Sequence, residues 1–400
     1  RPPRSTLFPY TTLFRSPAGV LIRRLGINKI QADDTLTIIF TSGSTGVPKG
    51  VQLTHANISS NVEAIEKAVR LNADDTIVGF LPFFHSFGFT VTLWAALKLN
   101  ISSVFHSSPL DAKKIGQLCQ DYSATVLLAT PTFLRGFLRR ITPEMFATLD
   151  VIVTGAEKLP VELAEAFEER FGIRPVEGYG TTELSPLVSV NIPPSRAFEP
   201  GKGIREGTVG RPVDGVVVKV TDLDTGEELG AEESGMLWVK GPNVMKGYFK
   251  RDDLTSESII DDWYKTGDVA QIDKDGFIKI TGRISRFSKI GGEMVPHIQI
   301  EEAINDLMGD SDEEDLLAAV TSVPDVKKGE RLIVLHLPTK REVDDIRSAL
   351  AEEKGLPNLF IPSRNSFIEV AELPVLGTGK LDLKGIKDIA MQHHGDDSPS

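Results

Sequence analysis

The sequence predicts an α/β fold, with a large N-terminal domain of parallel βα units, an antiparallel β region after it, and a small α+β domain at the C-terminal end. Three changes of pattern predict this organisation. Short β-branched runs alternate with amphipathic segments from Leu36 to Val176, closely spaced strands and turns fill Val209 to Thr281, and mixed helices and strands follow Gly282. We therefore expect residues 17–283 to form the large domain and residues 284–400 the small one.

Strand and helix candidates alternate along the first half of the chain. Strands are expected at 37–40, 77–81, 101–105, 125–129 and 151–154. Helices are expected at 57–69 after Thr54, and at 109–122, 131–140 and 160–170, because each begins near a capping residue or a proline. Ligands of such sheets bind beyond the carboxyl ends of the strands, which is where we place the loops after Phe40 and Thr154.

The small domain has its own set of elements. Helices are expected at 297–308 and 342–353, strands at 318–322, 332–336 and 366–370, and a solvated acidic loop at 310–315. Residues 1–16 lack periodicity and resemble translated adapter sequence, so we expect a non-native leader there. The native large domain is then expected to be truncated at its N-terminus.

Composition narrows the function classes. The chain has 400 residues, 40% of them hydrophobic, which is typical of globular cores. A net charge of −12 argues against the broad basic face of a nucleic-acid-binding protein. The single cysteine, Cys119, excludes an internal disulfide and is expected in the core of a cytoplasmic protein. The apolar window 80–99 is interrupted by polar residues and reads as buried core.

The stretch Thr41-Ser42-Gly43-Ser44-Thr45-Gly46-Val47-Pro48-Lys49-Gly50 has the composition of a phosphate-binding loop. Its glycines let backbone N–H groups approach oxygens closely, its hydroxyls add donors, and Lys49 supplies a mobile positive charge. The spacing is not that of a Walker loop, because Lys49 follows Gly46 by three positions. By composition alone, a Ser/Gly/Thr run is more often a plain flexible loop.

Two carboxylates stand beside glycines further along the chain. In the stretch from Glu177 to Glu183, Gly178 and Gly180 flank an aromatic ring, and Glu183 is a hard oxygen ligand suited to Mg²⁺ beside phosphates. In the stretch 263–268 we expect Asp268 at a tight turn, where it could accept hydrogen bonds from a diol such as ribose. Each motif alone also fits an ordinary turn.

Two basic motifs follow. Gly282-Arg283 and Lys289-Ile290-Gly291-Gly292-Glu293 lie at the expected domain junction, and Lys380 is preceded by glycines at 377 and 379. In this order and at these separations, the five motifs resemble the adenylate-forming superfamily of acyl-CoA synthetases, luciferases and peptide-synthetase adenylation domains. The resemblance covers about residues 36–387. Stretches 177–191 and 286–301 are most similar to bacterial acyl-[acyl-carrier-protein] synthetases, including the 2-acylglycerophosphoethanolamine acyltransferase type fused to an acyltransferase.

The resemblance implies an AMP-binding ligase that works in two steps. A carboxylate attacks the α-phosphate of Mg·ATP to give acyl-AMP and pyrophosphate, and a thiol then displaces AMP. By position, Thr182, Glu183 and Lys380 would be catalytic, with Glu183 also holding Mg²⁺ and Lys380 inserted from a lid formed by the small domain. The resemblance assigns the nucleotide to Thr41, Ser42, Gly43, Ser44, Thr45, Gly46, Lys49, Gly155, Ala156, Glu157, Gly178, Tyr179, Gly180, Asp268 and Arg283.

The same resemblance assigns His85 to the acyl pocket, Ser285 to the hinge of the lid, and Lys289 and Gly292 to the thiol tunnel. At the hinge the family usually has Asp or Lys, so this chain departs from the pattern. A buried core histidine is the alternative interpretation of His85. The apolar neighbours of His85 favour an apolar acyl chain over an amino acid, whose ammonium would need a buried carboxylate.

We therefore expect ATP-dependent, Mg²⁺-dependent activation of a long-chain fatty acid, with CoA or the phosphopantetheine of an acyl-carrier protein as the thiol. The alternatives are a short-chain or aryl acid–CoA ligase and, from another class, a non-catalytic nucleotide-binding fragment. No nucleic-acid partner is expected. We place the protein in the cytoplasm and consider peripheral association with the inner face of the membrane, directly or through a missing fused domain.

Overall fold

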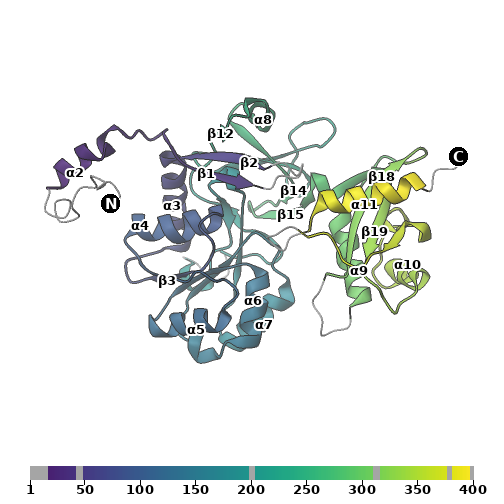
Figure 1. The fold of residues 1–400 in the computed structure, drawn as a ribbon, viewed down its shortest axis with the longest axis horizontal. Helices are drawn as coiled ribbons and strands as arrows, with labels where there is room; N and C mark the ends of the chain where they lie inside the picture. Colours follow the sequence, from purple (N-terminus) through teal and green to yellow (C-terminus); the bar gives the residue numbers. More distant parts are fainter. Residues whose placement is uncertain (1–16, 42–47, 198–202, 310–315, 376–380, 397–400) are drawn as a thin grey trace, which may run out of the picture.

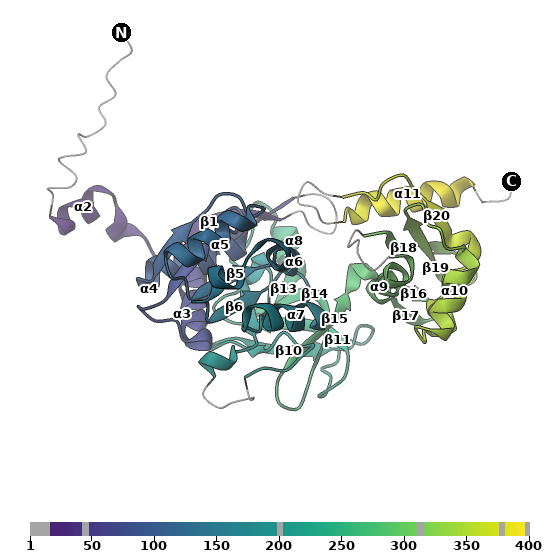
Figure 2. The ribbon, with the colours of Figure 1, turned by 90° about the horizontal axis from the view of Figure 1, so that it is seen from below.

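The computed structural model describes residues 17–41, 48–197, 203–309, 316–375 and 381–396. In these ranges the strands form a seven-stranded, a three-stranded and two five-stranded sheets. Figures 1 and 2 show the strands after residue 286 in a separate body beside the rest of the molecule. Ahead of the first strand, the short helix α2 (Ala18–Arg24) has no buried residue.

The seven-stranded sheet carries the parallel βα units that the sequence predicts. Its order is β4-β3-β5-β6-β7-β8-β9, and the pairing is parallel from β4 to β7 and antiparallel from β7 to β9. Every residue of β5 and β6 is buried, as in strands covered on both faces. The strands are β3 (Thr76–Gly79), β4 (Ser102–Phe105), β5 (Val126–Ala129), β6 (Val151–Thr154), β7 (Val176–Gly180), β8 (Leu187–Val190) and β9 (Arg211–Pro212).

The helices of this region begin close to the predicted positions. Thr54 caps α3 by accepting a hydrogen bond from Asn57 N, and the Asn57 side chain accepts one from Thr54 N. Asp111 caps α5 in the same way. Helices α5, α6 and α7 lie next to one another along the sheet (Figures 1 and 2). The helices are α3 (His55–Val69), α5 (Ala112–Asp121), α6 (Pro131–Arg140) and α7 (Val161–Phe171).

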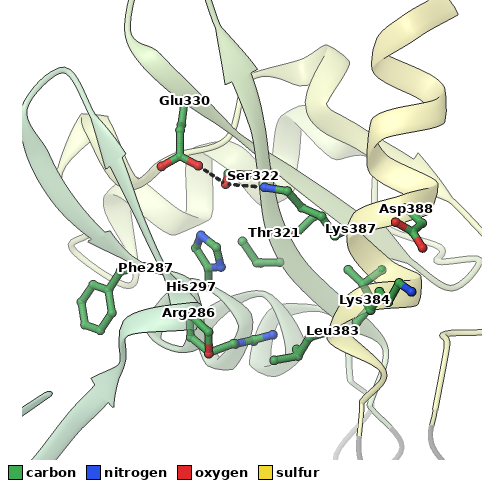
Figure 3. A pocket seen from close by; sticks show the side chains of 13 residues that line it. Arg286, Phe287, His297, Thr321, Ser322, Glu330, Leu383, Lys384, Lys387 and Asp388 are labelled. Atoms are coloured by element: carbon green, nitrogen blue, oxygen red, sulfur yellow. Dashed lines mark hydrogen bonds between the residues drawn. The ribbon is translucent and has the colours of Figure 1, made fainter. Parts of the chain in front are cut away.

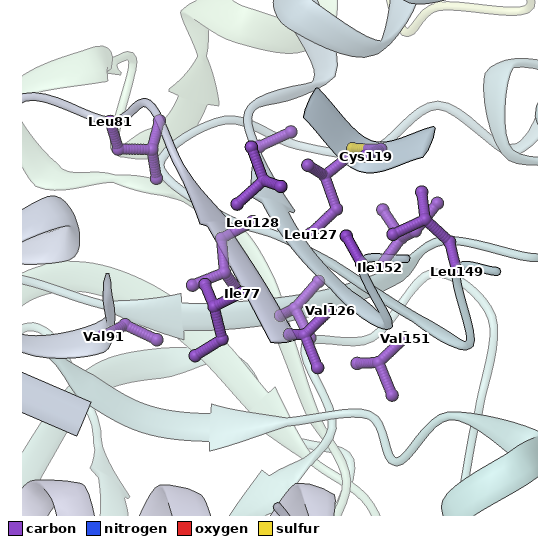
Figure 4. Close-up of a cluster of buried hydrophobic side chains, with 14 of the residues drawn as sticks. Ile77, Leu81, Val91, Cys119, Val126, Leu127, Leu128, Leu149, Val151 and Ile152 are labelled. Atoms are coloured by element: carbon purple, nitrogen blue, oxygen red, sulfur yellow. The ribbon is translucent and has the colours of Figure 1, made fainter. Parts of the chain in front are cut away.

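The main core lies between this sheet and its helices. Figure 4 shows Leu127 and Ile152 from the adjacent strands β5 and β6 packed near Cys119 of α5, whereas Ile77 and Val126 lie on the other face of the sheet. Cys119 is fully buried, as predicted, and burial raises its pKa to about 12. The window 80–99 contains a π-helix, η2 (Phe87–Trp94), and helix α4 (Ala95–Leu99). Among the helices of the described ranges, none has the length and apolar character needed to cross a membrane.

One strand prediction was wrong in its pairing. Strand β1 (Thr35–Thr41) was expected in the parallel sheet, but it pairs antiparallel with β2 (Lys49–Thr54), and β2 pairs with β12 (Gly247–Tyr248). Strand β2 is not among the predicted strands, because only two apolar residues, Val51 and Leu53, stand between the Gly/Ser loop and the start of the helix at Thr54, which is a short strand signal. The phosphate-loop motif therefore connects the strands of a hairpin rather than a strand and a helix.

The antiparallel region predicted at 209–281 is confirmed. Strands β10, β11, β14 and β13 are neighbours in that order, and β15 pairs with β14. The predicted turn at 274–276 connects β14 to β15, and the turn at 224–226 lies between β10 and β11. The elements are β10 (Val217–Thr221), β11 (Gly235–Lys240), α8 (Asp252–Ser258), β13 (Ile259–Ile260), β14 (Trp263–Ile272) and β15 (Ile278–Arg283).

The C-terminal α+β region has its own sheet and its own core. The sheet order is β17-β16-β19-β18, and β20 pairs parallel with β19. Its two apolar clusters draw only on residues from Ile290 onward. The elements are η6 (Ile284–Arg286), β16 (Phe287–Ile290), β17 (Glu293–Pro296), α9 (His297–Met308), β18 (Ala318–Asp325), β19 (Gly329–His336), α10 (Val343–Glu352), β20 (Phe367–Glu369) and α11 (Leu383–Asp396).

Candidate active site

The two ends of the phosphate-loop motif are held by the β1–β2 hairpin. Thr41 ends β1, Lys49 begins β2, and the two residues are register partners. The Lys49 ammonium lies 5.2 Å from the centre of the Tyr248 ring, within reach of a cation–π contact. The predicted residues Ser42, Gly43, Ser44, Thr45 and Gly46 lie outside the described residues.

The motif around Tyr179 lies in β7, the strand next to β6 in the seven-stranded sheet. Gly155 and Ala156 follow β6, and Gly178 lies in β7, so that a Cβ placed on Gly155 would be 3.5 Å from the Gly178 carbonyl oxygen. Ala156 has a left-handed φ of 68°. A Cβ on Gly180 would lie 2.1 Å from the Pro186 carbonyl oxygen, so this position requires glycine. The two stretches assigned to the adenine are therefore adjacent.

Thr182 and Glu183 lie in the short helix η4 (Thr182–Leu184) that directly follows. The Thr182 side chain is buried and its hydroxyl lies 3.1 Å from the Ser86 hydroxyl. Glu183 Oε1 accepts a hydrogen bond of 2.8 Å from the Tyr248 hydroxyl. Tyr248 thus contacts both the phosphate-loop lysine and the carboxylate assigned to Mg²⁺.

Asp268 and Arg283 form the ribose end of the candidate site together with Tyr179. Arg283 Nε lies 2.8 Å from Asp268 Oδ1, and the Tyr179 hydroxyl donates to Asp268 Oδ2 at 2.5 Å. Burial raises the pKa of Asp268, while Arg283 and Tyr179 act in the opposite direction. The Asp268 charge raises the pKa of Arg283. Asp268 is thus a fixed acceptor and Arg283 a fixed cation, and the arginine is accessible to a polar ligand.

The predicted position of Asp268 at a tight turn was wrong. It lies inside the long strand β14, next to Gly267, whose φ is 77°. The pairing of β14 with β11 skips from Lys265 to Val269, so the strand bulges at these residues. A glycine–aspartate pair signals a turn in sequence, whereas here the glycine serves a bulge that turns the carboxylate toward Tyr179.

Two glutamates of the site differ in their surroundings. Glu157 Oε2 accepts hydrogen bonds from Thr132 N at 3.1 Å and from its hydroxyl at 2.7 Å, and so caps helix α6. Burial raises the pKa of Glu177 to about 7, against a weaker opposing effect of the Leu159 N–H and Lys158. Glu177 therefore titrates near neutral pH.

The residues assigned to the C-terminal part are placed at its junction with the rest. Lys289 pairs with Asp224 of the β10–β11 connection at 2.8 Å, and Ser285 is exposed in η6. Gly292 is exposed and has a φ of 93° in the turn between β16 and β17. Lys158 also bridges the two parts, 3.1 Å from Glu302. Lys380 lies outside the described residues.

The interpretation of His85 as a buried core histidine is wrong. His85 is exposed, as are Phe83 and Phe84, and its Nδ1 accepts a hydrogen bond of 3.3 Å from Phe87 N. The window 80–99 favours a core interpretation because it contains six aromatic residues, but two of them, Phe83 and Phe84, are exposed. The assignment of His85 to an acyl pocket stays a prediction.

The described residues fit a magnesium–nucleotide pair. No group of three or more His, Cys, Asp or Glu side chains that could hold a metal occurs among them. Mg²⁺ is usually bound by one or two carboxylates together with substrate phosphates, and Glu183 alone can supply the protein ligand. In the same segment, Thr181 Oγ1 is buried and has no hydrogen-bond partner among the described residues, which leaves a polar atom for a ligand.

A separate cavity of about 330 Å³ lies within the C-terminal region (Figure 3). Of the predicted site residues, only Ser285 lines it. Lys387 and Glu330 both bond the Ser322 hydroxyl, at 3.4 and 2.8 Å, in the arrangement that Figure 3 shows. His297 lines the same cavity, and burial together with nearby cations lowers its pKa to about 3. The cavity is thus distinct from the candidate nucleotide site.

Sequence reasoning missed two residues of the site, Ser86 and Tyr248. Ser86 is buried within the aromatic run that was assigned to the acyl pocket. Tyr248 belongs to a two-residue strand, and its neighbours in sequence carry no periodic pattern. The Gly247-Tyr248 pair gave the only signal, since a glycine before an aromatic residue also marks the Tyr179 motif.

Comparisons with known proteins identify the family of this chain. Residues 14–249 match the family described as AMP-binding enzyme. The long-chain-fatty-acid–CoA ligase of Bacillus subtilis is 30% identical over 387 residues, which cover 92% of this chain and 64% of that protein. A probable 4-coumarate–CoA ligase 3 of Dictyostelium discoideum is 30% identical, with 89% and 63% covered. The chain thus spans less than two thirds of the length of these relatives.

Solved structures show the same likeness. ATP-bound MatB from Rhodopseudomonas palustris superposes with a TM-score of 0.76 at 30% identity, covering 90% of this chain and 69% of that one. The o-succinylbenzoate CoA synthetase MenE from Bacillus subtilis, in complex with an acyl-adenylate intermediate, superposes with a TM-score of 0.77 at 26% identity, covering 90% and 70%. On the strength of the family match over more than half of its length, this chain belongs to the AMP-binding enzyme family.

Proposed function

We propose that the protein activates a fatty acid with ATP to form acyl-AMP and pyrophosphate, and then transfers the acyl group to a thiol. The observation that carries this proposal is the convergence of Tyr179, Asp268 and Arg283 at one end of the site and of Lys49 and Glu183 at the other. A nucleotide needs a polar contact for its ribose and cations for its phosphates, and these two groups of residues supply them.

In this proposal each residue acts through its charge or its hydrogen bonds. Asp268 accepts from the ribose hydroxyls, Arg283 adds a cation beside them, and Thr182 donates to the α-phosphate. Lys49 lies at the pyrophosphate end and stabilises the leaving group. Glu183 would hold Mg²⁺, which neutralises phosphate charge when it is bound. Lys380 would supply the cation between the carboxylate and the α-phosphate.

We further propose that residues 17–283 form the adenylation domain and that residues 284–400 act as its lid. Their separate cores and the exposed ion pairs between them, Lys289 with Asp224 and Lys158 with Glu302, support a junction that can reopen, because exposed ion pairs contribute little stability. Ser285, in the short helix after Arg283, is the proposed hinge. Lys289 and Gly292 would line the path of the thiol after the lid rotates.

The names of the relatives support CoA as the thiol and a fatty acid as the substrate, and a long-chain-fatty-acid–CoA ligase of Yersinia pestis adds to this support. An acyl-carrier protein as thiol donor and peripheral membrane association stay proposals from the sequence resemblance. A second candidate is an aryl acid–CoA ligase, which the 4-coumarate–CoA ligase relatives favour.

Carboxylate-dependent release of pyrophosphate tests the proposal. The 400-residue protein is incubated with Mg·ATP and, in separate reactions, palmitate, 4-coumarate or acetate, and then with CoA or phosphopantetheinylated carrier protein. We expect the highest release with palmitate. Highest release with 4-coumarate would instead establish the aryl acid ligase. Absence of release with all three acids, together with retained ATP binding, would favour a non-catalytic nucleotide-binding protein.

A further inference from the structure

The segment 245–249 connects the two phosphate-facing parts of the candidate site. Met245 N donates to the Glu183 carbonyl oxygen at 2.8 Å. On its other side, Lys246 N donates to Gln52 O at 3.0 Å and Phe249 N donates to Gly50 O at 2.7 Å. The backbone of this segment is therefore fixed between η4, which carries Glu183, and β2, which begins with Lys49.

Tyr248 extends this connection with its side chain. Its hydroxyl donates to Glu183 Oε1 at 2.8 Å, and its ring centre lies 5.2 Å from Lys49 Nζ. Tyr248 is the register partner of Val51, and Lys49 lies two positions before Val51 on the same face of the strand. The ring is 3% exposed, so the contacts belong to a buried side chain.

The position of the ring is itself fixed. Tyr248 N donates to Thr255 Oγ1 at 2.9 Å. The preceding Gly247 has a φ of 145°, and a Cβ there would lie 2.8 Å from Thr255 Cγ2. The chain therefore approaches α8 at a distance that only glycine allows. These contacts hold Tyr248 as a fixed point between Lys49 and Glu183.

This fixed point separates two opposite charges. Lys49 and Glu183 both contact Tyr248 but make no ion pair with each other in the described part of the chain. Without an intervening group, a lysine and a glutamate in a partly buried site attract one another strongly. Such an ion pair would have to break before a phosphate could bind the lysine or a metal ion could bind the carboxylate.

We propose that Tyr248 is a positioning residue that holds Lys49 and Glu183 apart and aims each at its own part of a magnesium–nucleotide ligand, the ring acting on Lys49 and the hydroxyl on Glu183. The inference rests on the proposed function, because it takes Glu183 as the magnesium ligand and Lys49 as the pyrophosphate contact. Burial and the Glu183 charge raise the pKa of the Tyr248 hydroxyl above its ordinary value, which is consistent with the hydroxyl acting as the donor to Glu183.

Substitutions can separate the two roles. Tyr248→Phe keeps the ring and removes the donor, whereas Tyr248→Leu removes both. ATP binding to the 400-residue chain is measured by calorimetry, first without metal and then over a series of Mg²⁺ concentrations. Tyr122→Phe is the matched control, because Tyr122 is an exposed residue at the end of α5, outside the site.

We expect Tyr248→Phe to raise the Mg²⁺ concentration at half-saturation by about tenfold, since a hydrogen bond to a charged group is lost. Its metal-free ATP affinity should stay within about twofold of the unsubstituted protein. Tyr248→Leu should also weaken metal-free ATP binding, by about fivefold, through the loss of the ring beside Lys49. Tyr122→Phe should change neither quantity.

A double-substitution cycle distinguishes a specific effect on Glu183 from a general loss of structure. In a Glu183→Gln background, Tyr248→Phe should have no further effect on the Mg²⁺ dependence, whereas a purely structural effect would persist there. An unchanged Mg²⁺ dependence in Tyr248→Phe, or equal metal-free affinities in the Phe and Leu variants, would overturn the proposal. If the unsubstituted protein binds ATP without any dependence on Mg²⁺, the proposed function fails first, and this inference fails with it.

Discussion

Arg283 and Asp268 are register partners on β15 and β14, and Arg283 Nε lies 2.8 Å from Asp268 Oδ1. The two side chains differ in their access to solvent, since that of Asp268 is 8% exposed and that of Arg283 is 54% exposed. The carboxylate is thus held from inside by Tyr179 and from outside by the arginine. A ligand entering from solvent meets the arginine first and the carboxylate behind it.

Asp268→Asn should weaken ATP binding by about tenfold, because an ionised acceptor forms stronger hydrogen bonds than an amide. Binding is measured by calorimetry with ATP and with 2′,3′-dideoxy-ATP, which lacks the diol. The substitution should matter little for the dideoxy nucleotide. Asp275→Asn, in the exposed turn of the same hairpin, is the control. Equal losses for both nucleotides would contradict a ribose contact.

Lys380→Ala should lower carboxylate-dependent pyrophosphate release by at least about tenfold, as the loss of one electrostatic donor does in other active sites. ATP binding should change much less, because the lysine acts on the reacting groups. Lys274→Ala, in the β14–β15 turn, serves as a control for the loss of a lysine. Pyrophosphate release within about twofold of the unsubstituted protein would remove Lys380 from the mechanism.

Lys289→Ala should affect the second half of the reaction more than the first. The ion pair with Asp224 is exposed on both sides, so its loss should change the free energy of unfolding by less than about 1 kcal/mol. Transfer to CoA is measured in single-turnover experiments beside pyrophosphate release. The Asp224→Asn variant removes the same pair without removing the lysine. If both variants behave alike, the lysine contributes only through the ion pair.

Glu177 should make stability depend on pH near neutrality. Burial raises its pKa in the folded protein to about 7 from the ordinary value of 4.5, so the folded state binds more protons than the unfolded state between these two pH values. Stability is therefore lost as the pH rises from about 4.5 to about 7, by up to about 3 kcal/mol. Glu177→Gln should lack this loss. Denaturant unfolding of both proteins at pH 5 and pH 8 should show the Gln variant gaining relative stability only at pH 8.

Gly180→Ala should destabilise the protein by about 2 kcal/mol or more, since its Cβ would meet the Pro186 carbonyl oxygen. Gly136→Ala is a matched substitution in helix α6, where no atom lies within 4 Å of the added Cβ. It should instead stabilise by about 0.5–1 kcal/mol. Thermal unfolding of the two variants measures these changes. A loss of much less than about 2 kcal/mol in Gly180→Ala would show that the turn after β7 can shift.

The sequence was sufficient for elements with a clear local signal. Helix α3 begins after Thr54 because both halves of its capping box are local, and β6 matches the prediction because three β-branched apolar residues, 151–153, stand between Asp150 and Thr154. Pairing partners were harder, since β1 and β5 look alike in sequence, and only tertiary contacts place β1 opposite β2. Gly267-Asp268 likewise reads as a turn in the sequence, and only the pairing of β14 with β11 shows that it is a bulge.

Within the candidate site, the order of the glycine-rich motifs assigned Tyr179, Asp268 and Arg283 to one ligand, and the structure places these three residues in contact. Tyr248 escaped notice because its role depends on contacts with residues 65 and nearly 200 positions earlier in the chain. His85 was ambiguous because aromatic runs occur both in cores and on surfaces, and composition does not say which side of a loop faces inward.

The pairing of β12 with β2 also bears on how the protein is made. Gly247 pairs with Gln52, which lies 195 positions earlier, so β2 has one free edge until most of the large sheet region has been synthesised. Contacts of such high sequence separation form late in folding. The three-stranded sheet β1-β2-β12 can therefore be completed only after residue 248 has left the ribosome, and chaperone protection of the β1–β2 hairpin during that interval would favour correct folding.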